Sequence, residues 1–287
     1  MAAVRFDVNL SILFTELPVL ARPAAARDAG FDAVEFWWPW PVAVPSDTEV
    51  DAFVAAVRDA GVRLVGLNFF AGDMPGGDRG LVSWPARSGE FRDNVDVAVG
   101  IGEQLGCRAF NALYGNRLDG VAPQAQDGLA RENLALAAHA AGRIGGTVLV
   151  EPVSGAPRYP LRTAADALAV VDRVAGESDG AENVALLLDL YHLAVNGDDV
   201  EKAIGTAAGR ASGTAAGRIG HVQIADAPGR NEPGTGSLPL DPWLDRIAAT
   251  GYTGHVGLEY KPSGASADAF DWLPRARRAA SWREERA

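Results

Sequence analysis

The chain has 287 residues, of which 48% are hydrophobic and 22% charged, a composition typical of a globular protein with a sizeable buried core. Its 37 acidic residues outnumber the 26 basic ones and give a formal charge of -11, which argues against a nucleic-acid backbone or an anionic membrane surface as partner. A small anionic substrate is compatible with this charge, because a metal ion or a few local cations can hold it.

The sequence also restricts the compartment and the kind of metal site. Cys107 is the only cysteine, which excludes an internal disulfide and a cysteine-based zinc cluster. The first residues lack the charged leader, apolar core and cleavage site of a signal peptide, and no run of about 18 apolar residues occurs. We therefore expect a cytoplasmic protein without a membrane span. With only four histidines, a metal site would rely on carboxylates.

Short apolar segments alternate with longer Ala-rich segments along the chain. In chain order they predict strand 6–10, helix 17–28, strand 33–36, helix 47–60, strand 63–68, helix 89–105, strand 107–112, helix 124–144, strand 147–151, helix 163–175, strand 184–189, helix 200–208, strand 219–224, helix 242–250, strand 254–259 and helix 266–279. Strand sequences such as VLVE and ALLLD are nearly continuous apolar runs, as expected for parallel strands that are covered on both faces.

Eight strand–helix units in this length predict an α/β fold, a closed (β/α)8 TIM barrel. We expect a single domain over residues 1–287, with a charge-rich helical tail at its C-terminus. A doubly wound open sheet is the alternative, but no glycine-rich nucleotide-binding motif follows the first strand.

Oxygen-bearing side chains stand at or near the ends of four successive predicted strands, namely Glu151, Asp189, Gln223 and Glu259. The carboxyl ends of barrel strands surround the active site, so we expect these side chains to converge there. Burying three carboxylates together is unfavourable unless a cation compensates for their charge. Oxygen donors alone favour Mg²⁺ or Mn²⁺, although any one of these residues could instead cap a helix or form a salt bridge.

Further polar residues are predicted around this end of the barrel. His192 lies just beyond the sixth strand, where it would contact a substrate. Arg230, in a loop rich in Pro and Gly, suits a substrate carboxylate or a surface position. Lys261, just beyond the eighth strand, could supply another cation for the substrate or form a plain salt bridge. His221 is expected one layer deeper, either beside the metal ligands or as a hydrogen-bonded core residue.

A tryptophan cluster follows the second predicted strand, with indole rings at Trp37, Trp38 and Trp40. These rings could form a wall of the substrate pocket, pack under a loop or lie at a subunit contact. Together with the long C-terminal helix, they would suit a homo-oligomer.

Several segments together resemble the hydroxypyruvate isomerase family: VNLSILF, GFDAVEF, the AGD…DRG loop, EFRDNVDVA, LVEP, DLYH, GHVQIAD, EPGTG and GLEYKP. This family belongs to the xylose-isomerase-like TIM barrels, with 2-oxo-tetronate isomerases and ketose 3-epimerases, and the resemblance runs from about residue 6 to residue 261. It implies substrate contacts by His192 and Arg230 and an acid/base pair formed by Glu151 and Glu259. It also implies a metal bound by Glu151, Asp189, Gln223 and Glu259.

The sequence departs from the family pattern at the predicted pocket. Ser154 stands where the family usually has Asn, Met74 stands where it has Trp, and the segment after the second strand is rich in Trp. These changes leave the predicted metal ligands intact and leave the identity of the substrate open.

The resemblance implies isomerisation of hydroxypyruvate to tartronate semialdehyde through an enediolate, with Mg²⁺ or Mn²⁺ and without a redox cofactor. One alternative is the same chemistry on a related oxo-tetronate, or 3-epimerisation of a ketose. A non-catalytic sugar-acid binding protein is a second alternative. A metal-dependent endonuclease on a related barrel is a third, which the negative charge and the small number of histidines disfavour.

Overall fold

A computed structural model describes residues 4–177, 181–209 and 218–279 of the chain. In this part, eight parallel strands pair in chain order and close into a barrel. β1 pairs with β8, with Arg5 opposite His255 and Val8 opposite Leu258, and this pairing closes the barrel. The predicted (β/α)8 barrel is therefore confirmed. The strands are β1 (Arg5–Asn9), β2 (Ala33–Phe36), β3 (Arg63–Asn68), β4 (Ala109–Asn111), β5 (Thr147–Val150), β6 (Val184–Asp189), β7 (Ile219–Ile224) and β8 (His255–Leu258).

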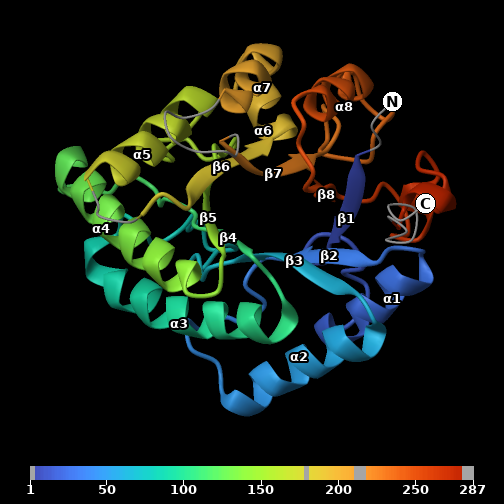
Figure 1. The fold of residues 1–287 in the computed structure, drawn as a ribbon, viewed down its shortest axis with the longest axis horizontal. Helices are drawn as coiled ribbons and strands as arrows, with labels where there is room; N and C mark the ends of the chain where they lie inside the picture. The colour runs from blue at the N-terminus through green and yellow to red at the C-terminus, as the bar shows by residue number, and fades with distance from the viewer. Residues whose placement is uncertain (1–3, 178–180, 210–217, 280–287) are drawn as a thin grey trace.

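Helices form a ring around the strands and follow the chain around the barrel (Figure 1). No helix in the described ranges is long and apolar enough to cross a membrane. The helices are α1 (Arg22–Asp28), α2 (Asp47–Ala60), α3 (Ser88–Leu105), α4 (Pro123–Gly142), α5 (Ala164–Glu177), α6 (Leu190–Val195), α7 (Val200–Ala208) and α8 (Leu240–Ala249). Short 3-10 turns occur at η1 (Val19–Ala21), η2 (Pro85–Arg87), η3 (Asp268–Phe270) and η4 (Arg275–Arg277).

Helix α2 shows how local sequence sets the predicted boundaries. The Ser46 side chain accepts a hydrogen bond from the Glu49 backbone N–H (3.4 Å), and the Glu49 carboxylate accepts one from the Ser46 N–H (2.9 Å). This capping box satisfies backbone donors that have no partner within the helix. Gly61 ends the helix with a φ of 66°, a left-handed conformation that glycine adopts without steric cost.

Two predicted helices differ from the structure, and one helix of the structure was not predicted. The first predicted helix begins only at Arg22, because the chain from Val19 forms a 3-10 turn. The predicted helix 266–279 is wrong in its described part, which contains only η3 and η4; Pro274 lies between these turns and cannot continue a helix. Residues 280–287 of the predicted tail lie outside the described residues. Helix α6 was not predicted from the sequence.

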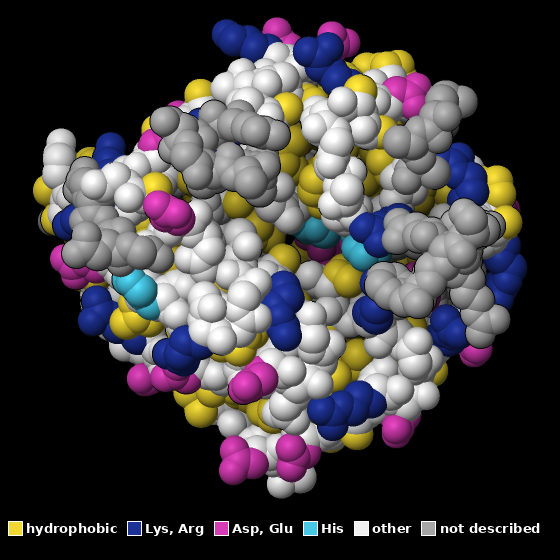
Figure 2. All heavy atoms as spheres, in the orientation of Figure 1, with side chains coloured by type: hydrophobic (Ala, Val, Ile, Leu, Met, Phe, Trp, Pro, Cys, Tyr) yellow, Lys and Arg dark blue, Asp and Glu magenta, His cyan; other side chains and the backbone are white. Residues whose placement is uncertain are grey.

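Charged side chains are mixed on the face of the barrel drawn in Figure 2. Both Lys and Arg side chains and Asp and Glu side chains occur around its rim. The described residues form no continuous basic stripe on this face, in keeping with the net negative charge of the chain.

Phe110 on β4 lies in the apolar layer between the barrel and its helices. Its side chain is fully buried, and its ring stacks on Phe69 with a centroid separation of 5.6 Å. Phe69 in turn packs edge-on against Phe91 of α3 at 5.6 Å. These aromatic contacts join β4 and the residue directly after β3 to α3, the helix that covers them.

We expect Phe110→Ala to lower the free energy of unfolding by about 3–5 kcal/mol, because the substitution leaves a cavity in a closely packed core. Urea unfolding followed by circular dichroism measures the change. Leu136→Ala, at a residue 37% exposed on α4, is the control and should cost far less. Equal losses in the two variants would contradict this account of the core.

Candidate active site

A cavity of about 1000 Å³ opens where the loops that follow the strands meet. The residues that line this cavity include members of the loops that follow β1, β2, β3, β5, β7 and β8. Trp37, Trp38 and Trp40 are part of its wall, so the structure places the tryptophan cluster at the pocket. The Trp38 ring packs against Trp40 at a centroid distance of 4.8 Å, and Trp40 packs against Phe53 of α2 at 5.4 Å. Helix α2 therefore supports this wall.

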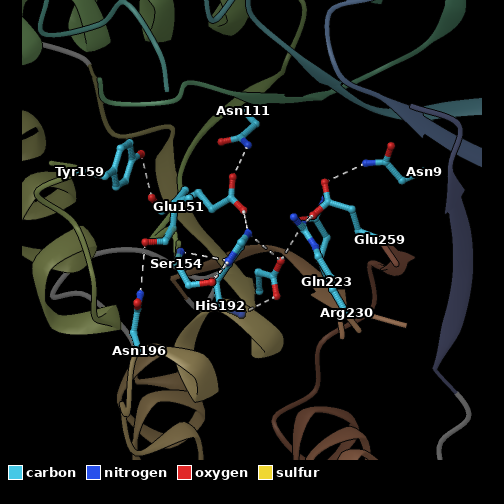
Figure 3. A network of polar contacts seen from close by, with 12 residues as sticks. Asn9, Asn111, Glu151, Ser154, Tyr159, His192, Asn196, Gln223, Arg230 and Glu259 are labelled. Atoms are coloured by element: carbon cyan, nitrogen blue, oxygen red, sulfur yellow. Dashed lines mark hydrogen bonds and ion pairs between the residues drawn. The ribbon is translucent and has the colours of Figure 1, made fainter. Parts of the chain in front are cut away.

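The predicted acidic residues converge at the base of this cavity. Glu151 directly follows β5, Asp189 ends β6 and Glu259 directly follows β8, and all three are buried. These three carboxylates and His192 each offer a ligand atom within 4.8 Å of the others. In Figure 3, Glu151 and Glu259 reach toward each other from opposite sides of the site, with His192 and Arg230 between them. The strand ends thus bring together residues that are far apart in the sequence.

Each of these carboxylates has one oxygen held by a neutral donor at the edge of the site. Asn111 Nδ2 donates to Glu151 Oε2 (2.7 Å). Asn9 Nδ2 (3.0 Å) and Trp37 Nε1 (2.6 Å) donate to Glu259 Oε1. Asp189 Oδ1 accepts from the backbone N–H of His192 (3.0 Å) as the N-cap of α6. The second oxygens of Glu151 and Asp189 lie on the side of His192 Nε2, whereas the second oxygen of Glu259 contacts Arg230.

Gln223 of β7 contributes a fourth oxygen. Its Nε2 donates to Glu35 Oε1 (2.7 Å), which orients the amide because a carboxylate can only accept. Its Oε1 is buried and has no hydrogen-bond partner among the described residues. An unpaired buried oxygen is unfavourable. The donor set of Glu151, Asp189, Gln223 and Glu259 therefore fits a hard divalent cation, which would coordinate such an oxygen.

Close packing of these carboxylates changes their protonation. Burial raises the pKa of Glu151 well above its usual range, and the charges of Glu259 and Asp189 act in the same direction. Burial also raises the pKa of Glu259, to about 7, although the charge of Arg230 opposes this. Both groups therefore hold a proton more readily than an exposed glutamate does.

Arg230 supplies the positive charge within the cluster. Its Nη2 contacts Glu259 Oε2 and lies 3.8 Å from Asp189 Oδ2, and its guanidinium lies 5.4 Å from the centre of the Tyr191 ring. The structure thus places Arg230 at the predicted site, where it pairs with the carboxylates. Lys261 also lines the cavity, but it is exposed, and its backbone N–H donates to the Arg230 carbonyl (2.7 Å).

His192 has a defined tautomer. Its Nδ1 accepts a hydrogen bond from the Ser154 backbone N–H (3.0 Å), and the Ser154 hydroxyl lies 2.7 Å from the same atom. Because Nδ1 is an acceptor, the proton of the neutral ring is on Nε2, which lies 3.6 Å from Asp189 Oδ2 and 3.9 Å from Glu151 Oε1. Burial lowers the pKa of His192 to about 4. His192 therefore presents an N–H donor to the site and carries no charge near neutral pH.

We expect His192 to be neutral and protonated on Nε2 between about pH 5.5 and 8, because burial disfavours the charged ring and Ser154 donates to Nδ1. Long-range ¹H–¹⁵N correlation spectra of histidine-labelled protein measure this, with exposed His139 as the internal reference. Titration of the His192 ring near pH 6.5, or a proton on Nδ1, would contradict the assignment.

A second charged group lies one layer deeper in the barrel. His221 Nε2 donates to Glu35 Oε2 (2.7 Å), and it lies 3.9 Å from Asp7 Oδ2. Burial lowers the pKa of His221, but the charge and hydrogen bond of Glu35 outweigh this effect and raise it to about 9. His221 is thus a hydrogen-bonded core residue that holds Glu35, which in turn orients Gln223.

Glycines on β3 and β8 make room for Glu35. A Cβ atom at Gly66 would lie 3.1 Å from Glu35 Oε2, and one at Gly257 would lie 2.7 Å from Oε1. Sequence reasoning did not select Glu35, Asn9 or Asn111 as site residues. For Glu35 a signal existed, since it is a lone acidic residue within the predicted strand AVEF.

The family model of the xylose isomerase-like TIM barrel matches residues 23–281. The chain belongs to this family. A Streptomyces coelicolor protein, provisionally named a hydroxypyruvate isomerase, is 57% identical over 96% of this chain and 98% of its own length. Hydroxypyruvate isomerase of Escherichia coli K12 is 32% identical over 94% of this chain and 98% of its own.

Two further similarities bear on the alternatives considered for the function. A 2-oxo-tetronate isomerase of Cupriavidus necator is 35% identical over 94% of this chain and 97% of its own length. The crystal structure of AP endonuclease, family 2, from Brucella melitensis is 34% identical, with a TM-score of 0.81 over 94% of this chain and 98% of that one. This chain is therefore a homologue of proteins named as isomerases of short oxo acids.

Proposed function

We propose that this protein interconverts hydroxypyruvate and tartronate semialdehyde with the help of a bound Mg²⁺ or Mn²⁺ ion. The observation that carries the proposal is the arrangement of Glu151 and Glu259, which face each other across a buried site, each with one oxygen held by neutral donors. Homologues that match nearly the whole chain are named as hydroxypyruvate isomerases, which supports the proposal.

Glu151, Asp189, Gln223 and Glu259 would hold the metal ion. The unpaired oxygen of Gln223 and the inner oxygens of the carboxylates support this assignment. When bound, a divalent cation stabilises negative charge that develops on substrate oxygens as a carbon-bound proton is removed. His192, with its proton on Nε2, would donate a hydrogen bond to the substrate from the same side of the site.

The reaction moves hydrogen within one molecule. One of the two glutamates removes a proton from C3 of hydroxypyruvate, the carbon that bears the hydroxyl group, and the other delivers a proton to C2. The hydroxyl proton passes from O3 to O2, so that C3 becomes the aldehyde and C2 the secondary alcohol. No redox cofactor is required. Each glutamate serves both directions of the exchange, because its carboxylate accepts a proton and its carboxylic acid donates one.

The cavity also favours a second candidate substrate class. Its volume of about 1000 Å³ is large for a three-carbon acid, and its tryptophan wall leaves room beyond the carboxylates. A four-carbon oxo-tetronate or a ketose would react by the same proton exchange between neighbouring carbons. A substrate panel with the purified protein separates these candidates from hydroxypyruvate, and it separates an enzyme from a sugar-acid binding protein.

We expect Glu151→Gln and Glu259→Gln each to lower kcat by at least about 100-fold, because each removes one partner of the proton exchange. Proton NMR of hydroxypyruvate in D₂O, with Mg²⁺ or Mn²⁺, follows the product and the exchange of carbon-bound hydrogen. Glu103→Gln, at an exposed residue of α3, is the matched control and should retain wild-type turnover. Near wild-type kcat in either site variant would rule out the assigned pair.

We expect chelation with EDTA to abolish turnover and added Mg²⁺ or Mn²⁺ to restore it.

Titration calorimetry should show that Asp189→Asn weakens Mn²⁺ binding by more than about 10-fold, because it removes a charged donor. Asp96→Asn, at a residue with a side chain 79% exposed, is the control. Unchanged Mn²⁺ affinity in Asp189→Asn would place the metal elsewhere.

A further inference from the structure

The centre of the site has no spare positive charge for an anionic substrate. Glu151, Asp189 and Glu259 carry three formal negative charges, which a divalent cation and Arg230 together offset. The carboxylate of an oxo acid adds one more negative charge. Since an uncompensated charge in a partly buried site is unfavourable, a further cation at the cavity wall is needed.

Among the described residues that line the cavity, the cations are Arg79, Arg230 and Lys261. Arg230 already pairs with carboxylates, and Lys261 is exposed. Arg79 lies on the loop between β3 and η2 and is partly buried. Its Nη1 donates to the carbonyls of Met74 (2.9 Å) and Asp78 (2.6 Å). In the described part of the chain, Arg79 forms no salt bridge, and its Nε and Nη2 are free for an anion.

The loop that carries Arg79 is held in one conformation. The Gly80 N–H donates to the Ala71 carbonyl (3.0 Å) and closes the loop. Asp78 Oδ2 accepts from the Asp73 N–H (2.7 Å) and from Arg87 Nη1 (2.7 Å), which ties the loop to the start of α3. The guanidinium of Arg79 is therefore positioned before a ligand binds, which lowers the entropic cost of binding.

Gly80 allows the loop to pass closely over the neighbouring chain. Its φ of 106° lies in the left-handed region. A Cβ atom there would lie 1.8 Å from the Leu113 carbonyl oxygen, so only glycine fits. The loop thus holds Arg79 in the cavity wall next to the residue that packs against Leu113, just beyond β4.

Arg79 lines the same cavity as His192 and Arg230, which lie at the proposed substrate site.

We propose that Arg79 binds the carboxylate of the substrate and makes the site selective for oxo acids over neutral ketoses, an inference that rests on the isomerase function proposed above. The planar guanidinium, with Nε and Nη2 free, matches a carboxylate through two parallel hydrogen bonds. Arg79 is then a substrate-binding residue, while the proton exchange stays with Glu151 and Glu259.

The test compares a carboxylate substrate with its neutral analogue. Hydroxypyruvate and dihydroxyacetone differ in that a CH₂OH group replaces the carboxylate. We expect Arg79→Met to lower kcat/KM for hydroxypyruvate roughly 10- to 100-fold, mainly through KM, and to leave kcat/KM for dihydroxyacetone within about twofold of the wild-type value. Arg79→Lys, which keeps the charge but not the planar fork, should lie between Arg79→Met and wild type.

Calorimetric titration with glycerate gives a second readout that does not depend on turnover. Glycerate carries the carboxylate but is not isomerised, and we expect Arg79→Met to weaken its binding roughly 10- to 100-fold. Unchanged Mn²⁺ affinity and melting temperature show that the variant is folded and its metal site intact. Arg143→Met, at a residue with a side chain 64% exposed, is the matched control and should bind glycerate like wild type.

The outcomes separate this inference from the proposed function. Wild-type glycerate binding in both Arg79 variants would overturn the role of Arg79, even if hydroxypyruvate is isomerised. A loss seen with Lys261→Met but not with Arg79→Met would assign the carboxylate to Lys261 and overturn it equally. An inactive wild-type protein with a weakened glycerate site in Arg79→Met would overturn only the proposed isomerase function.

Discussion

Three carboxylates buried at one end of a barrel are the constraint on which the rest of the site depends. Glu151, Asp189 and Glu259 repel one another, and burial removes the water that would screen them. Arg230 lies inside the cluster and offsets part of this negative charge. Neutral donors such as Asn111 and Trp37 donate hydrogen bonds to the carboxylates around it. Neutral donors fix the positions of the carboxylates without cancelling their negative charge.

The interior of the barrel supports this site from below. Most barrel interiors are apolar, but here Glu35 and His221 form a buried ion pair within reach of the site. The pair is held between two glycines that leave room for the carboxylate, and Glu35 directs the amide of Gln223. Asn9 donates to both Glu35 and Glu259, so one side chain joins the deeper layer to the catalytic layer. Positions set by strands in this way are more rigid than positions set by loops.

In the proposed function, catalysis and substrate recognition depend on different parts of the fold. Residues at strand ends would bind the metal ion and exchange protons, whereas the loops supply the indole wall and the cations at its edge. Loops in TIM barrels vary without disturbing the strands, so substrate choice can change while the chemistry is kept. Homologues named for hydroxypyruvate and for 2-oxo-tetronate fit this division, because both substrates require the same proton exchange between neighbouring carbons.

The order of the eight strands, the closed barrel, and the convergence of Glu151, Asp189 and Glu259 followed from the sequence alone, whereas α6 was not predicted and the predicted helix 266–279 is wrong. Apolar runs, helix caps and the residues at strand ends are local sequence patterns, and they predict strands, helix ends and site residues without knowledge of the tertiary contacts. Only the tertiary structure determined which side chains contact one another in the site. Arg230 contacts Glu259, and Ser154 donates to Nδ1 of His192 and so sets its tautomer. Glu35 accepts from the amide of Gln223 and so orients it. These contacts join residues from different strand–helix units. Their geometry depends on barrel closure and register, which no local pattern in the sequence encodes.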